Sequence, residues 1–118
     1  MNKENILLDK SLSFAARIVK LHKHLIKTYK ESVISRQIIR SGTSIGANIN
    51  EANYGSTADF INKMQIAQKE TAETEYWIRL LRLSDFLDEQ EFESLLKDCL
   101  DIKNILTATL KTAKSNKK

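Results

Sequence analysis

The sequence predicts an all-α protein whose single domain, residues 1–118, is an up-down-up-down antiparallel four-helix bundle. Proline is absent and glycine occurs three times among the 118 residues, whereas strand-rich folds need many turns, which are rich in both residues. Apolar residues recur at alternating spacings of three and four along four long segments, as they do on the buried face of a helix. The connections are only a few residues long, so we expect consecutive helices to be antiparallel neighbours.

The first helix is expected over residues 5–29. One face of it is apolar and consists of Leu7, Phe14, Ile18, Leu21, Leu25 and Tyr29. The opposite arc of the same helix is basic and consists of Lys10, Arg17, Lys20, Lys23, Lys27 and Lys30. Charged helix faces are usually just solvated, but a basic stripe is also the electrostatic signature of a surface that binds nucleic-acid phosphates. The sequence leaves both interpretations of this stripe open.

The second helix is expected over residues 34–53, with a heptad seam formed by Ile38, Gly42, Ile45, Ile49 and Ala52. Gly42 and Gly46 each cost about 1 kcal/mol of helix propensity relative to alanine. We expect this cost to be offset by the close approach of a neighbouring helix over a surface of small residues. Gly55 is expected to end the helix in the left-handed conformation.

The third helix is expected over residues 57–86, and Ser56 with Asp59 forms the capping box that starts it. Its core seam consists of Phe60, Met64, Ala67, Thr71, Thr74, Ile78 and Leu81. Beside this seam runs a mixed stripe of polar and apolar residues, namely Asp59, Lys63, Ile66, Glu70, Glu73, Trp77 and Leu80. The mixed stripe is too polar for a core and too apolar for a solvated face, so we expect it to contact a neighbouring helix or another subunit.

The fourth helix, expected over residues 89–113, is started by the corresponding pair Asp88 and Glu91. Its seam consists of Phe92, Leu95, Cys99, Ile102, Leu106 and Thr109. Cys99 on this seam is interpreted as a small buried hydrophobe, because a catalytic thiolate needs an open and electropositive setting. Residues 114–118 are expected to form a frayed, basic tail.

The net charge of +4 is unevenly distributed along the chain. Residues 1–31 hold seven basic and three acidic residues, whereas residues 88–110 hold two basic and six acidic residues. No apolar run reaches the roughly 18 residues of a membrane span, and the first residues do not form a secretory signal. A single cysteine cannot form an intramolecular disulfide. We therefore expect a cytoplasmic protein that does not enter the membrane.

No arrangement of catalytic or metal-binding residues is evident in the sequence. A di-iron site in a helical bundle needs Glu-x-x-His pairs, but neither His22 nor His24 follows a glutamate by three positions. The segment 42–46 contains two glycines but lacks the Gly-Lys-Ser/Thr ending of a phosphate-binding loop. No nucleophile, base and orienting group can be recognised together. We therefore predict no catalytic residue, no metal site, no cofactor and no enzymatic activity.

Two stretches of the sequence are distinctive. The first runs from Arg40 to Ala52 and reads Arg-Ser-Gly-Thr-Ser-Ile-Gly-Ala-Asn-Ile-Asn-Glu-Ala. The second combines Ser56, Asp59, Phe60 and Lys63 with Ile66, Ala67, Lys69, Glu70, Glu73, Thr74, Tyr76 and Trp77. Together they resemble the bacterial family of 23S rRNA intervening-sequence proteins, and the accessory protein of diversity-generating retroelements is similar to that family. The resemblance extends over essentially the whole chain.

The resemblance implies a four-helix bundle that assembles as a homopentamer, and it implies no catalytic residue. The retroelement relatives bind nucleic acid and a reverse transcriptase through basic surfaces. The basic residues of this chain that match the motif positions are Arg36, Arg40, Lys63 and Lys69.

The distinctive residues also fall on two polar stripes. Those of the second helix are Ser41, Ser44, Asn48 and Glu51, and those of the third helix are Lys63, Glu70, Glu73 and Trp77. Buried polar pairs specify the register of two helices more than they add stability. Our hypothesis is that these stripes hold the second and third helices in a fixed register, either within one subunit or between subunits.

Two functions remain open from the sequence. In the first, the protein binds RNA or DNA with little sequence specificity through Lys10, Arg17, Lys20, Lys23, Lys27, Lys30, Arg36 and Arg40. In the second, the protein is an interaction scaffold that makes no contact with nucleic acid. The oligomer would then present its acidic fourth helix or its mixed stripe to a protein partner.

Overall fold

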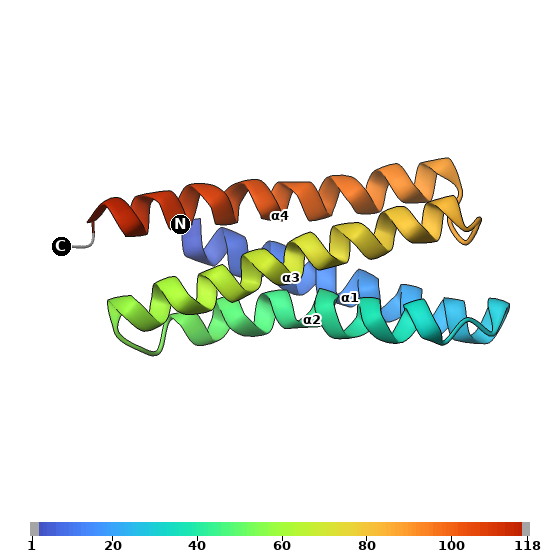
Figure 1. The fold of residues 1–118 in the computed structure, drawn as a ribbon, viewed down its shortest axis with the longest axis horizontal. Coiled ribbons are helices and arrows are strands. Elements are labelled where there is room, and N and C mark those ends of the chain that lie inside the picture. Colours follow the sequence, from blue (N-terminus) through green and yellow to red (C-terminus); the bar gives the residue numbers. More distant parts are fainter. Residues whose placement is uncertain (1–2, 117–118) are drawn as a thin grey trace.

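The computed structural model describes the backbone of residues 3–116 and the side chains of residues 6–116. Four helices account for most of this part of the chain, which contains no strand: α1 (Lys3–Tyr29), α2 (Val33–Ala52), α3 (Thr57–Leu83) and α4 (Glu89–Asn116). They lie nearly parallel to one another in an elongated bundle of 50 × 22 × 22 Å (Figure 1). Each helix packs against its two neighbours in the ring α1–α2–α3–α4 and none packs across the diagonal. The predicted all-α four-helix bundle is confirmed.

The predicted seams form the core. Fully buried side chains come from all four helices, and the largest of them are Leu7, Phe14, Ile18, Leu25, Ile38, Ile45, Ile49, Met64, Ile78, Leu81, Ile102 and Leu106. Tyr29 is an exception, because it lies at the end of the bundle and remains 46% exposed. Its ring packs edge-on against Phe86, with the ring centroids 5.3 Å apart.

The glycines of α2 allow α1 to approach closely. A Cβ atom at Gly42 would lie 2.9 Å from the Ile18 side chain, which is shorter than a van der Waals contact. A Cβ atom at Gly46 would lie 3.0 Å from the Ser11 hydroxyl oxygen. The close approach predicted from the two glycines is confirmed, and its partner is α1.

Both predicted capping boxes are present. The amide of Asp59 donates to the Ser56 hydroxyl oxygen at 3.1 Å, and the amide of Ser56 donates to the Asp59 carboxylate at 3.0 Å. The equivalent bonds join Asp88 and Glu91 at the start of α4. A third cap was not predicted, because the Glu31 carboxylate accepts the first three amide protons of α2.

The helix ends differ from the sequence prediction in two turns. The third helix ends at Leu83 rather than at residue 86, because Asp85 adopts a φ of 66° and the Phe86 amide bonds back to the Leu81 carbonyl. This is the Schellman arrangement that terminates helices. The left-handed conformation predicted for Gly55 is wrong, since no described glycine has a positive φ. Lys30, with a φ of 56°, adopts it at the end of α1 instead.

The last helix is longer than predicted. It continues to Asn116, so residues 114–116 are helical and not a frayed tail, whereas residues 117–118 lie outside the described part of the chain. Within the described helices, none combines the length and the apolar character that a membrane span requires. The cytoplasmic location expected from the sequence stays a prediction.

The close α1–α2 contact predicts the effect of enlarging Gly42. Gly42→Val should lower the free energy of unfolding by about 1–3 kcal/mol, because the new methyl groups overlap with Ile18 in a packed core. Ala72→Val is the matched control, since Ala72 is exposed within α3 and should change stability by only a few tenths of a kcal/mol. Urea denaturation followed by circular dichroism measures both. Equal stability of the two variants would contradict the tight packing.

Candidate functional site

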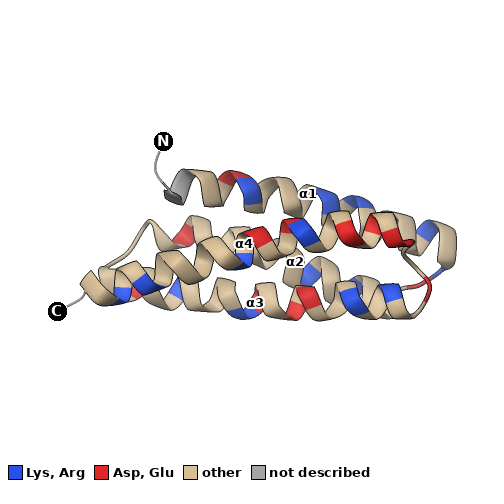
Figure 2. Ribbon diagram, turned by 90° about the horizontal axis from the view of Figure 1, so that it is seen from above, with Lys and Arg blue, Asp and Glu red and all other residues tan. Residues whose placement is uncertain are grey.

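Five basic side chains gather where α1 ends and α2 begins. They are Lys20, Lys23, Lys27, Lys30 and Arg36, and all five are exposed. None of them forms an ion pair with a described carboxylate. Figure 2 shows Lys and Arg along the second half of α1, opposite acidic residues in the first half of α4. We call these five residues the basic cluster.

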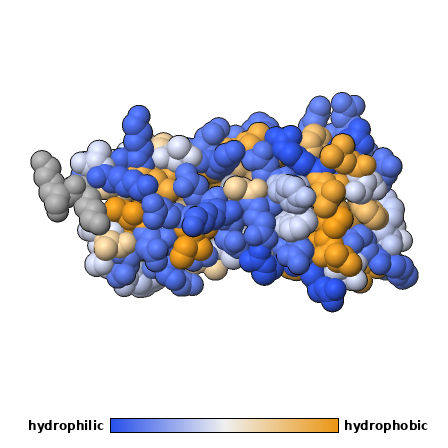
Figure 3. All heavy atoms as spheres, in the orientation of Figure 1, coloured by the Kyte–Doolittle hydropathy of each residue, from blue (hydrophilic) through white to orange (hydrophobic). Residues whose placement is uncertain are grey.

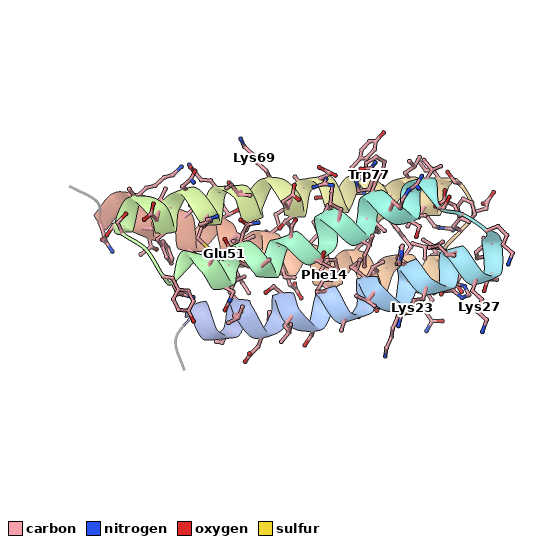
Figure 4. All side chains as sticks on the ribbon, turned by 90° about the horizontal axis from the view of Figure 1, so that it is seen from below. Phe14, Lys23, Lys27, Glu51, Lys69 and Trp77 are labelled. Carbon is pink, nitrogen blue, oxygen red and sulfur yellow. The ribbon has the colours of Figure 1, made fainter. Side chains whose placement is uncertain are left out.

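The α1–α2 turn brings the two helices of the basic cluster together. The hydroxyl oxygen of Ser35 lies 2.5 Å from Nδ1 of His22, so α2 carries Arg36 to the level of Lys23 on α1. The ammonium group of Lys30 donates to the carbonyl oxygen of Lys27 at 3.2 Å, which satisfies one of the last carbonyls of α1. Lys23 and Lys27 point away from the bundle, on the edge opposite Lys69 (Figure 4).

Of the other three residues of the predicted basic surface, two are ion-paired, and Lys10 lies beside carboxylates as Lys20 lies beside Glu91 of α4. The Arg17 guanidinium lies 2.7 Å from the Asp98 carboxylate and also donates to the carbonyl oxygen of Ser94. Lys10 lines a cavity of about 320 Å³ between α1 and α4, together with Asp9, Asp98 and Asp101 among others. Arg40 is paired with two glutamates of α3. Six of the eight predicted residues are therefore without an ion pair, and the five other than Lys10 make up the basic cluster.

The second predicted group forms a polar seam between α2 and α3. Arg40 donates to Glu70 at 3.0 Å and forms a short contact with Glu73. The Ser44 hydroxyl donates to the same Glu70 carboxylate, whose side chain is only 16% exposed. The indole N–H of Trp77 donates to the Glu73 carboxylate at 3.1 Å. Two carboxylates of α3 are thus held by one arginine of α2.

The seam continues to both sides of this arginine. The hydroxyl oxygens of Ser41 and Thr74 lie 2.8 Å apart in the core. Further along, the Asn48 amide donates to the carbonyl oxygen of Ser44 at 2.8 Å, and Lys63 pairs with Glu51 at 3.0 Å. All eight residues predicted to act in register or at an interface lie along α2 and α3 of a single chain. Their role in fixing the register stays a prediction.

The polar seam keeps Glu73 ionised. The hydrogen bond from Trp77 lowers the pKa of the Glu73 carboxyl below its ordinary value, and Arg40 acts in the same direction, whereas partial burial opposes both. The pKa of Arg40 is raised in turn, chiefly by its hydrogen bond with Glu73. Both groups are charged at neutral pH, so the seam holds a true ion pair.

A histidine–serine contact and a buried cysteine lie within the bundle. Nδ1 of His22 lies 3.2 Å from the carbonyl oxygen of Ser35. The same Nδ1 contacts the fully buried Ser35 hydroxyl, so the imidazole joins α1 to the first turn of α2. Burial raises the pKa of the Cys99 thiol to about 12, so this cysteine remains protonated at neutral pH. Among the described residues, no group of three side chains could hold a metal ion.

A second apolar stripe on α1 was not predicted from the sequence. It consists of Leu8, Leu12, Ala15, Ala16 and Val19, of which Leu12 is 68% exposed. The adjacent outward positions of α2 hold Ile39, Thr43 and Ala47. No charged residue belongs to this surface, which we call the uncharged face. The alternating spacing of four and three from Leu8 to Val19 was the signal that could have revealed it.

The polar seam is formed by residues of the two distinctive stretches of the sequence. Comparison with known proteins gives the same family that these stretches resemble. Residues 3–108 match the family described as 23S rRNA-intervening sequence protein. The chain belongs to this family. The relation of the family to retroelement accessory proteins stays a prediction, and no curated protein matches the chain.

A solved structure supports the family assignment. The crystal structure of a protein with unknown function from the S23 ribosomal protein family of Bacteroides thetaiotaomicron is 50% identical to this chain. The match covers 93% of this chain and 99% of that chain, with a TM-score of 0.91. The two proteins therefore share their helices and the arrangement of those helices.

The polar seam predicts a pH-dependent effect of removing Arg40. Arg40→Met should cost about 1 kcal/mol at neutral pH, because it leaves the half-buried carboxylates of Glu70 and Glu73 without their cation. The Glu73 pKa is lowered in the folded state, so its stabilising effect is complete above its ordinary value of 4.5 and is lost as the pH falls through the folded-state pKa. The cost of Arg40→Met should therefore shrink toward pH 3.

Urea denaturation between pH 3 and pH 7 measures this dependence. Arg36→Met is the matched control, because Arg36 lies one turn away on α2 without an ion pair and should show little cost at any pH. A cost of Arg40→Met that is the same at pH 3 and pH 7 would contradict a stabilising ion pair in the seam.

Proposed function

We propose that this chain is a non-enzymatic, self-associating protein that binds nucleic acid with low sequence specificity through the basic cluster. The observation that carries the proposal is the set of five exposed cations that no described carboxylate neutralises. The α1–α2 turn places them on one end of the bundle. Elsewhere, most of the described arginines are engaged with carboxylates or carbonyl oxygens of the same chain.

Phosphate groups are the ligands that suit the basic cluster. Each phosphate contact by a lysine or arginine releases condensed counterions, so several contacts add to a large and salt-dependent affinity. Contacts to phosphates position a protein but do not read the bases. The cluster contains no aromatic side chain on which a base could stack, so the proposed binding has little sequence preference.

Self-association strengthens the proposed binding to nucleic acid. The uncharged face lies on the same two helices as the basic cluster, nearer the start of α1, and large exposed apolar surfaces typically mark interaction sites. Copies that associate through the uncharged face would gather their basic clusters around one end of the assembly. The homopentamer implied by the family resemblance would bring five clusters together, and linked sites bind with higher avidity than one site.

Charge reversal in the basic cluster tests the nucleic-acid proposal. Lys23→Glu should weaken the binding of a structured RNA or a DNA duplex about tenfold, because it removes one phosphate contact and adds a repulsive charge. The wild-type protein should show a slope of about −4 in a plot of log affinity against log salt, as five contacts predict. Fluorescence anisotropy with labelled RNA and DNA, from low to physiological salt, measures both quantities.

The matched control is Lys69→Glu, which makes the same charge change on the opposite edge of the bundle. At physiological salt it should leave the affinity within about twofold of the wild-type value, since the bundle is 22 Å wide and charges are screened beyond about 8 Å at this ionic strength. Equal losses in the two variants would show a general charge effect and contradict a site. No binding at low salt would leave the scaffold function, without nucleic-acid contact, as the alternative.

The uncharged face predicts how self-association can be disrupted. Leu12→Glu should dissociate the oligomer, because it places a carboxylate in the middle of an apolar contact. The monomer should keep its helical content, since Leu12 is 68% exposed within one chain. Light scattering after size-exclusion chromatography measures the mass. Leu83→Glu, at an exposed leucine of α3, is the control that should leave the mass unchanged, and a monomeric wild-type protein would contradict the proposal.

A further inference from the structure

An exposed apolar patch lies where α2 begins and α3 ends. Its members are Val33, Tyr76, Trp77, Leu80 and Leu83, and we call it the apolar patch. Leu83 is 82% exposed, Val33 65% and Tyr76 59%, while Trp77 and Leu80 are half-buried. Figure 3 shows the broadest hydrophobic area of this face of the molecule at the same end of the bundle. Neither the basic cluster nor the uncharged face includes any of these residues.

The register of α2 and α3 makes these residues one surface. Arg40 of α2 meets Glu73 of α3, and the two helices are antiparallel. Seven residues back along α2 from Arg40 is Val33, and seven residues forward along α3 from Glu73 is Leu80. Two turns beyond the ion pair, Val33 and Leu80 are therefore neighbours across the groove. Tyr76 and Leu83 continue the surface on the next arc of α3.

Arginines surround the apolar patch. Arg36 is exposed without an ion pair, and the Arg40 and Arg79 side chains are 54% and 51% exposed. Arg40 and Arg79 each contact glutamates of α3, but these contacts use only some of the five N–H donors of a guanidinium. Glu73 and Glu75 beside the patch are engaged by these arginines, and the Glu31 carboxylate caps α2 by accepting from the Val33 amide. The border of the patch therefore offers free donors to acidic groups.

We propose that the apolar patch binds an amphipathic helix of a partner protein, in which apolar residues at spacings of three and four are flanked by aspartate or glutamate. Two antiparallel helices present a groove into which a third helix packs its side-chain ridges. Trp, Tyr and Arg are the residue types that carry most of the binding energy in protein interfaces. The arginines select acidic flanks on the partner by charge complementarity.

Other occupants fit the apolar patch less well. Three of its five members, Val33, Leu80 and Leu83, are aliphatic and have no stacking role toward a nucleic-acid base. The indole N–H of Trp77 is already bonded to the Glu73 carboxylate, which repels phosphate at this point of the patch. A second copy of the chain is assigned to the uncharged face on α1 and α2. The proposal does not depend on nucleic-acid binding.

A peptide selection tests the proposal. A displayed library of random peptides of about 16 residues, roughly 24 Å of helix, is selected on the wild-type protein after depletion on the Val33→Glu/Leu83→Glu variant. We expect the enriched peptides to share apolar residues at helical spacing, with acidic residues between them. Both substituted side chains are mostly exposed, so the variant should fold with nearly unchanged stability. Circular dichroism checks this.

Trp77 then reports where a selected peptide binds. It is the only tryptophan of the chain, so its emission should shift to shorter wavelength when the synthetic peptide covers it. The affinity should fall at least tenfold for the Val33→Glu/Leu83→Glu variant. It should be unchanged for Tyr54→Glu, which alters an equally exposed residue in the α2–α3 turn at the other end of the bundle, and for Lys23→Glu in the basic cluster.

Four outcomes would overturn the proposal. The first is that the selection yields no peptide whose binding depends on the apolar patch. The second is that the enriched peptides contain no acidic residues. The third is a change of Trp77 emission on adding single-stranded oligouridylate that is lost in the Val33→Glu/Leu83→Glu variant, which would make the patch a nucleic-acid site. The fourth is a lower oligomer mass of that variant, which would make the patch a contact between copies of this chain.

Discussion

A methyl group at Gly42 would lie 2.9 Å from the Ile18 side chain, and a methyl group at Gly46 would lie 3.0 Å from the Ser11 hydroxyl oxygen. This contact fixes the rotation of α1 about its own axis. Once Ile18 and Ser11 face the glycines of α2, the helical period turns Lys23 outward beside the first turn of α2. The same rotation leaves the uncharged face on the outer side of the α1–α2 contact. Both surfaces used in the proposed function therefore depend on two residues without side chains.

The opposite flank of α1 shows how the fold divides its basic residues. α1 packs more sparsely against α4 than against α2, and the α4 flank carries Asp98 and Asp101 beside a cavity of about 320 Å³. Arg17 lies on this flank and is paired with Asp98, whereas the lysines on the outer arc have no described acidic partner. A charge that is already paired within the chain contributes little to steering an anionic ligand. Because α4 pairs with Arg17, the unpaired positive charge in the second half of α1 lies on the lysines that approach the α1–α2 turn.

The sequence predicts what local chemistry and helical period decide. The core seams and both capping boxes follow from residue spacing, because each depends on residues three or four positions apart on one helix. The end of α3 was misplaced because the left-handed conformation at Asp85 has no strong sequence signal, whereas Gly55 carries the signal without adopting it. The pairing of Arg40 with Glu70 joins residues 30 positions apart. Which basic residues stay unpaired depends on such distant contacts. The sequence alone therefore could not distinguish the paired from the unpaired residues of the predicted basic surface.

Trp77 links the polar seam to the apolar patch. Its indole N–H donates to Glu73, which is paired with Arg40 in turn, so the ring is held by an ion pair that joins α2 to α3. A side chain that is already ordered loses little conformational entropy when a partner covers it. The apolar patch is therefore held rigid by the contacts between α2 and α3, whereas the position of the basic cluster depends on the packing of α1 against α2. Arg36 belongs to the basic cluster and also borders the apolar patch, so its substitution should affect both surfaces. Lys23 and Leu83 lie on α1 and α3, which do not pack against each other, so substitutions of these two residues should act additively.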